Sequence, residues 1–163
     1  MTLYTTVDSP IGPLMLCGDA HALTALYLPG RHPAPGPGWR RDDARFADAA
    51  HQLREYFAGE RTTFDVPLSP SGGGAFEREV WAELLNIPYG TTASYGEVAR
   101  RLGQPTAARA VGAANGRNPI AIIVPCHRVI GSDGSLIGYG GGLDVKRTLL
   151  DLEAGRSSLA LSA

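Results

Sequence analysis

The residues with the clearest chemical potential are Cys126 and the two that follow it, His127 and Arg128. They come directly after residues 120–124, an apolar run rich in β-branched side chains, which predicts a buried strand that Pro125 ends. Neighbouring cations lower the pKa of a thiol, and a thiolate with a base beside it is a strong nucleophile. The alternative is an ordinary buried cysteine, because free cysteine also behaves as a small apolar side chain.

Glu153 is the carboxylate best placed to complete a relay with these residues. It continues the inward face of a predicted last helix, which Asp144 caps and which carries several leucines on the same face. A buried carboxylate needs a partner, and His127 is the candidate. A Cys126–His127–Glu153 arrangement follows the order of nucleophile, base and orienting group, with the proton passing through a water.

The segment before Cys126 predicts a helix-turn-helix. Ser94 and Glu97 have the spacing of a capping box, and Gly103 is a natural end for the helix that they begin. A second helix over 107–116 consists mainly of alanine and glycine, so it can approach another surface closely. One face must pack on the core, and the other face could lie on DNA with Arg109 reaching into it.

Two further segments flank the cysteine. Asn118 precedes a proline and is therefore pushed out of helical geometry, which frees its side chain to tie the turn by local hydrogen bonds. Downstream, Tyr139 stands within the glycine-rich segment 138–142. Glycines let a flat ligand press against the backbone while Tyr139 offers a ring and a hydroxyl. The alternative for this segment is a flexible hairpin end.

Composition sets broad limits on the class of protein. The chain has 163 residues, of which 44% are hydrophobic and 19% charged, and this suits a soluble globular protein with one medium or two small domains. No apolar run approaches the ~20 residues of a membrane span, and no secretory signal begins the chain. Two cysteines make no disulfide framework, so a cytoplasmic location with reduced thiols is expected. The spacing of His21, His32 and Cys17 fits no zinc site, so no metal is expected.

Net charge is −1, which neither favours nor excludes a nucleic-acid partner. The second half nevertheless holds a run of arginines with no acid between them. Such a run predicts either a local basic surface that neutralises phosphates or an ordinary solvated face. Its members are Arg100, Arg101, Arg109, Arg117 and Arg128.

The pattern of elements indicates an α+β protein. Strands are expected over 3–8, 14–17 and 22–28, followed by a helix from 42 or 43 to about 58. This gives an N-terminal α/β domain over 1–70 with a small antiparallel sheet and a helix. A glycine-rich linker over 71–75 then leads to a mostly helical C-terminal domain over 76–163.

Together these motifs resemble the O6-alkylguanine-DNA alkyltransferases. The resemblance rests on residues 125–129, Asn118-Pro119 and 138–142, and it extends over 76–153 throughout. Residues 9–14 are similar to the opening of the family's N-terminal domain. The resemblance implies a winged-helix-like C-terminal domain, with Cys126 accepting an alkyl group from O6 of guanine in an irreversible, single-turnover displacement. It also implies His127 as base through a water and Glu153 as its orienting group.

The same resemblance assigns roles in DNA and substrate binding. Tyr95 would help to rotate and hold the nucleotide, and Arg109 would fill the space of the flipped base in a duplex bound through its minor groove. Tyr139 and the backbone N–H of Gly140 would bond to O6, where some relatives carry serine instead of Gly140. The carbonyls of Cys126 and Val129 would accept from the guanine amino group. No cofactor is implied, and no ligand set is evident for the zinc that some relatives bind.

Two other classes remain open from the sequence. Alkyltransferase-like proteins bind damaged DNA without catalysis and commonly replace the reactive cysteine by tryptophan, whereas this chain keeps Cys126. A Cys–His hydrolase acting on a small acyl substrate would turn over repeatedly. The expected partner is double-stranded DNA that contains O6-alkylguanine, bound by a monomer. The sequence decides neither the size of the alkyl group nor whether several copies assemble cooperatively on DNA.

Overall fold

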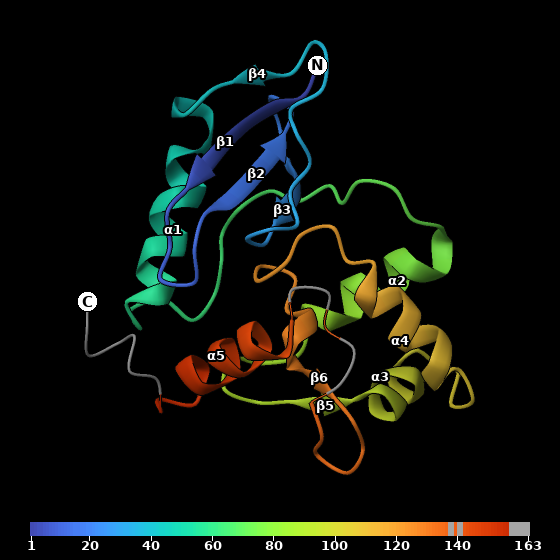
Figure 1. Ribbon diagram of the computed structural model, residues 1–163. Helices are drawn as coiled ribbons and strands as arrows, with labels where there is room; N and C mark the ends of the chain where they lie inside the picture. Colours follow the sequence, from blue (N-terminus) through green and yellow to red (C-terminus); the bar gives the residue numbers. More distant parts are fainter. Residues whose placement is uncertain (137–138, 140–141, 157–163) are drawn as a thin grey trace.

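The computed structural model describes residues 1–136, 139 and 142–156. Its N-terminal part is a sheet with strand order β3-β2-β1-β4 and a helix against one face (Figure 1). Strands β1 to β3 are antiparallel, as predicted, but β4 runs parallel to β1. The elements are β1 Leu3–Val7, β2 Leu14–Gly18, β3 Leu23–Tyr27, β4 Arg40–Arg41, the 3₁₀ turn η1 Ala44–Phe46 and α1 Ala47–Phe57.

Both faces of this sheet are covered, which explains why every residue of β2 is buried. Leu14 and Leu16 face the main core together with Leu53 of α1. On the opposite face, Met15 and Cys17 pack with aromatic side chains that include Trp39 from the long loop after β3. The whole sheet is therefore fixed by packing on two sides rather than by its short edge strand β4.

The C-terminal part is mostly helical, and the α+β class is confirmed. Its elements are α2 Ala75–Leu84, β5 Ala93–Ser94, α3 Tyr95–Arg101, α4 Ala108–Gly116, the 3₁₀ turn η2 Cys126–Arg128, β6 Val129–Ile130 and α5 Leu143–Glu153. The capping box is present, because Glu97 N–H donates to Ser94 Oγ at 3.1 Å and Ser94 N–H donates to Glu97 Oε1 at 3.2 Å. The predicted cap of α5 was wrong: its N-cap is Gly142, and Asp144 lies in the first turn.

The predicted strand over 120–124 was also wrong. The segment makes a single bridge, between Ile120 and Leu26 of β3, and then turns, with a positive φ of 72° at Ile122. Val124 N–H closes this turn on the Ile120 carbonyl at 3.1 Å. A short buried apolar run carries no periodicity that separates a strand from a buried turn. The residue that does indicate a turn, Asn118, lies outside the run.

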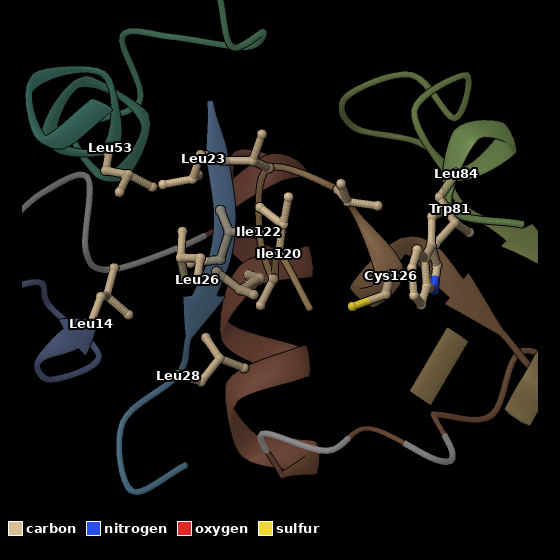
Figure 2. Packing of buried hydrophobic residues seen from close by; sticks show 14 of the residues in the cluster. Leu14, Leu23, Leu26, Leu28, Leu53, Trp81, Leu84, Ile120, Ile122 and Cys126 are labelled. Atoms are coloured by element: carbon tan, nitrogen blue, oxygen red, sulfur yellow. The ribbon is translucent and has the colours of Figure 1, made fainter. Parts of the chain in front are cut away.

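One hydrophobic core crosses the predicted linker. Leu26 and Leu53 of the N-terminal part share this core with Ile122, Trp81 and other residues of the C-terminal part (Figure 2). The proposed domain boundary at 71–75 stays a prediction. Among the described residues, no helix is long and apolar enough to cross a membrane. The same residues contain no cluster of three histidine, cysteine or acidic side chains that could hold a metal ion.

Candidate active site

Cys126 begins the 3₁₀ turn η2 and is only 6% exposed. Its backbone N–H donates to the Val124 carbonyl at 2.8 Å, so the buried turn directly sets its position. The thiol borders a cavity of about 200 Å³ between the N-terminal sheet and the end of α4. Side chains that share this wall are Leu26, Arg31, Asn115, Asn118 and Tyr139.

Asn118 ties the cysteine turn together, as its place before a proline suggested. Its Nδ2 donates to the Val124 carbonyl at 2.8 Å and to the Ile120 carbonyl at 3.3 Å, and its Oδ1 accepts from Ile120 N–H at 3.0 Å. These bonds satisfy backbone groups that have no strand partner. Asn118 therefore supports the position of Cys126 through the backbone as well as by lying beside the thiol.

The pKa of the Cys126 thiol is raised, because burial disfavours the thiolate. A hydrogen bond from Asn118 and the charge of Lys146 oppose this shift without reversing it. The expectation that His127 and Arg128 would lower this pKa was wrong, because both side chains turn toward Glu153 instead. The resting thiol is therefore protonated near neutral pH.

The side chains of His127, Arg128 and Glu153 form a buried hydrogen-bonded cluster, here named the relay. His127 is fully buried, and its Nε2 lies 2.7 Å from Glu153 Oε2, which is the contact anticipated from the inward face of the last helix. Arg128 binds the same carboxylate through Nε at 2.7 Å and Nη2 at 3.1 Å. Burial alone would raise the pKa of Glu153, but the bonds and charges of His127 and Arg128 lower it to about 2.

The ionised Glu153 fixes the tautomer of His127. A carboxylate can only accept, so His127 Nε2 must carry the hydrogen and Nδ1 presents a lone pair. Burial, together with the charges of Arg128 and Lys146, lowers the pKa of His127 despite the opposing effect of Glu153, so the ring is neutral at rest. Nδ1 is buried, and no other described residue bonds to it. His127 thus carries an acceptor lone pair at Nδ1 that no described residue uses.

Buried side-chain polar atoms without a partner gather in this region. Within the described part of the chain they are Asn115 Oδ1 and His127 Nδ1, and the buried Tyr139 hydroxyl has no partner other than the Cys126 thiol. Leaving such atoms unpaired costs roughly 1–3 kcal/mol each, so they point to a site that receives a ligand or ordered water. Asn115, whose Nδ2 donates to the Cys126 carbonyl at 3.3 Å, was not expected at the site. Its position at the end of a helix of small residues gave no chemical signal.

Lys146 is a second unexpected member. It is fully buried, and its Nζ donates to the Val129 carbonyl at 2.6 Å and lies 5.9 Å from the Tyr139 ring. This carbonyl was expected to accept from a guanine amino group. A carbonyl oxygen has two lone pairs, so Lys146 occupies one and orients the group. Gly140, the other predicted donor in this loop, lies outside the described residues.

A second, more open hollow lies over the helix-turn-helix. It is lined by Tyr95 and Gly96 of α3, by Ala108, Arg109 and Gly112 of α4, and by residues 131–133 and 135. Arg109 is exposed at the start of α4, and among the described residues no acid pairs with it. Burial is the main cause that raises the pKa of Tyr95, and a Cys126 thiolate raises it further.

The arginine run does not form one surface. Arg128 is buried in the relay, and Arg117 pairs with Glu77 at 3.5 Å. Arg100 and Arg101 of α3 are exposed, as is Arg109. The basic surface predicted from the run is therefore limited to the helix-turn-helix itself.

Replacing Glu153 by glutamine should destabilise the protein near neutral pH by about 3 kcal/mol, because Arg128 would keep a buried charge without its partner. The folded pKa of Glu153 lies below its ordinary value, so this stabilisation is present above that value and is lost as pH falls toward about 2. Denaturant unfolding should therefore give a difference in the free energy of unfolding between the wild type and Glu153→Gln that becomes smaller as the pH is lowered. Glu79→Gln, on an exposed carboxylate of α2, serves as control. A difference independent of pH would contradict this account of the pair.

Comparison with known proteins gives the same picture over the full chain. Residues 75–155 match the model of the 6-O-methylguanine DNA methyltransferase DNA-binding domain, and residues 2–70 match its ribonuclease-like domain. The methylated-DNA–protein-cysteine methyltransferase of Mycobacterium tuberculosis is 54% identical over 163 residues, covering 99% of this chain and 98% of the relative. A Methanosarcina acetivorans protein of the same name is 51% identical over 152 residues, covering 92% and 97%.

Solved structures agree. The M. tuberculosis OGT crystallised in complex with DNA superposes with a TM-score of 0.89 at 53% identity, covering 99% of both chains. The structure of the M. tuberculosis O6-methylguanine methyltransferase gives 0.88 at 54% identity, covering 99% of this chain and 98% of that one. With its buried cysteine, its relay and its helix-turn-helix in place, the chain belongs to the 6-O-methylguanine DNA methyltransferase family.

Proposed function

We propose that this protein repairs O6-alkylguanine in double-stranded DNA by transferring the alkyl group to Cys126, once per molecule. The observation that carries this proposal is the cavity beside Cys126, whose wall holds the unsatisfied Oδ1 of Asn115 and the buried Tyr139 hydroxyl next to the thiol. Such a cavity suits a flat base with a polar edge. The helix-turn-helix hollow lies nearby and supplies a surface for the duplex from which that base comes.

DNA binding and base flipping come first. The helix-turn-helix lies in the minor groove, where the small residues of α4 permit close approach. Tyr95 holds the rotated nucleotide, and the exposed Arg109 side chain fills the vacated stack. Flipping costs a few kcal/mol, least for a damaged base, so a filler of the gap favours capture of the lesion.

The chemical step is a displacement at the alkyl carbon. His127 Nδ1 takes the thiol proton through a water, and Glu153 stabilises the resulting imidazolium. The Cys126 sulfur then forms a bond to the alkyl carbon while the bond from that carbon to guanine O6 breaks. Tyr139 and the Gly140 N–H hydrogen-bond O6 as it gains charge, and the guanine anion finally takes up, through water, the proton that His127 removed from the thiol. The Cys126 and Val129 carbonyls hold the amino group of the base.

Incubation with a duplex that contains one O6-methylguanine tests this function. Mass spectrometry of the intact protein and of its peptides should find one methyl group on Cys126 and unmodified guanine in the DNA. Binding of the lesion without a mass change would indicate a non-catalytic lesion binder. Modification by activated acyl esters but not by the duplex would indicate a Cys–His hydrolase. We expect the protein to act in the cytoplasm, where thiols stay reduced.

A further inference from the structure

The N-terminal helix α1 reaches into the relay through one side chain. Tyr56 is fully buried, and its hydroxyl donates to Glu153 Oε2 at 2.6 Å across 97 residues of sequence. We propose that Tyr56 is a positioning residue for alkyl transfer: its hydroxyl fixes the Glu153 carboxylate and limits how strongly that carboxylate binds a proton on His127. This inference rests on the proposed function, because it concerns the base of the same reaction.

The bonds at the carboxylate show why the hydroxyl matters. Glu153 Oε2 accepts from Tyr56 at 2.6 Å, from His127 Nε2 at 2.7 Å and from Arg128 Nη2 at 3.1 Å. Glu153 Oε1 accepts only from Arg128 Nε at 2.7 Å among the described residues. Donors that share one oxygen compete for its charge. Removal of the tyrosine donor therefore strengthens the interaction of Oε2 with His127.

Tyr56 is held independently of Glu153. Its ring packs edge-on against Phe57 with centroids 5.2 Å apart, tilted against Phe64 at 5.5 Å and edge-on against Tyr89 at 6.3 Å. Aromatic packing of this kind fixes the direction of the hydroxyl. The pKa of Tyr56 is raised well above its ordinary value by burial and by the charge of Glu153, so the phenol remains a donor throughout the working range of pH.

The other groups around the relay stay in place when only the hydroxyl is removed. The ionisable groups that act on Glu153 or His127 from the neighbouring elements are Arg128, Lys146, Tyr89 and Tyr139. Loss of a donor to the carboxylate raises the pKa of Glu153, and the less saturated carboxylate raises the pKa of His127. Both changes protonate the relay at higher pH. They therefore move the acid limb of the rate profile, where the rate rises with pH, in the same direction.

The test is Tyr56→Phe, which keeps the packed ring. Single-turnover alkylation by the free base O6-benzylguanine would be followed between about pH 5 and 9, so that DNA binding does not enter. We expect the acid limb to move up by roughly half to one pH unit and the rate below neutral pH to fall about threefold to tenfold. Tyr4→Phe, on the opposite face of the sheet beside Trp39, should overlay the wild-type profile. In a Glu153→Gln background, Tyr56→Phe should produce no further shift.

A purely structural role would lower the melting temperature without moving the acid limb, and a folded Tyr56→Phe protein with a wild-type profile would overturn the proposal. If the variant does not fold, 3,5-difluorotyrosine at position 56 keeps the shape and is a stronger donor. It should move the acid limb to lower pH, and an unmoved limb would again overturn the proposal. Absence of methyl transfer from an O6-methylguanine duplex to the wild-type protein is a different result, because it contradicts the proposed function itself.

Discussion

Replacing Cys126 by serine should abolish alkyl transfer while DNA affinity changes by less than about twofold. A serine hydroxyl ionises far less readily than a thiol, and a neutral imidazole cannot deprotonate it to a useful extent, so we expect a loss of at least about a thousandfold. The side chain is 6% exposed and changes little in size, so the DNA-binding surface stays intact. Single-turnover transfer from an O6-methylguanine duplex measures the rate, and fluorescence anisotropy with the same duplex measures binding.

Cys17 provides the matched control. It is the second free cysteine, it is also buried, and burial raises its pKa to about 11. It lies on the outer face of the sheet in the cluster with Met15. Cys17→Ala should therefore transfer the alkyl group at the wild-type rate. Transfer that persists in Cys126→Ser, or that disappears in Cys17→Ala, would assign the nucleophile to another residue.

Arg109→Ala should separate the capture of a flipped base from the chemistry. If Arg109 fills the vacated stack, repair in duplex DNA should slow about a hundredfold, whereas reaction with free O6-benzylguanine, which needs no flipping, should change less than about twofold. The two rates would be measured at one ionic strength, because loss of any cation weakens DNA binding in a salt-dependent manner.

Arg54→Ala controls for the loss of charge. Arg54 is exposed on α1, outside the hollow over the helix-turn-helix. The Arg54→Ala protein should therefore repair duplex DNA and react with the free base at rates close to those of the wild type. Equal losses on duplex and free base in Arg109→Ala would show that this residue supports the fold or the cysteine. Such a result would remove it from the flipping step.

Features encoded by neighbouring residues were predictable. The Ser94–Glu97 capping box and Gly103 with φ +73° depend on chemistry within one helical turn, and both are present. Asn118 could be assigned to the turn because proline restricts the residue before it. The approach of Glu153 to His127 followed from helical periodicity and from the need of a buried carboxylate for a partner.

Features that depend on distant packing were missed. Tyr56 and Glu153 are 97 residues apart, and nothing near either residue encodes their contact. Arg128 was interpreted as a cation that lowers the pKa of the thiol. Its guanidinium instead donates to both oxygens of the Glu153 carboxylate and, at 2.7 Å, to the Ile87 carbonyl. The raised pKa of Cys126 reflects its burial, which the sequence around it does not report. The β4 pairing was missed because two exposed arginines carry no strand pattern.

The stoichiometry of transfer tests the central claim most directly. Alkylation of Cys126 yields a thioether, which is neither ionised nor a reasonable leaving group at neutral pH. It has no carbonyl carbon that an activated water could attack. Cys17 is not placed to remove the alkyl group either, because it belongs to a cluster on the other face of the sheet. Titration with excess O6-methylguanine duplex, without added thiol, should reach a plateau of one methyl group per protein on Cys126. Continued repair beyond one lesion per protein would contradict the account and favour a hydrolytic mechanism.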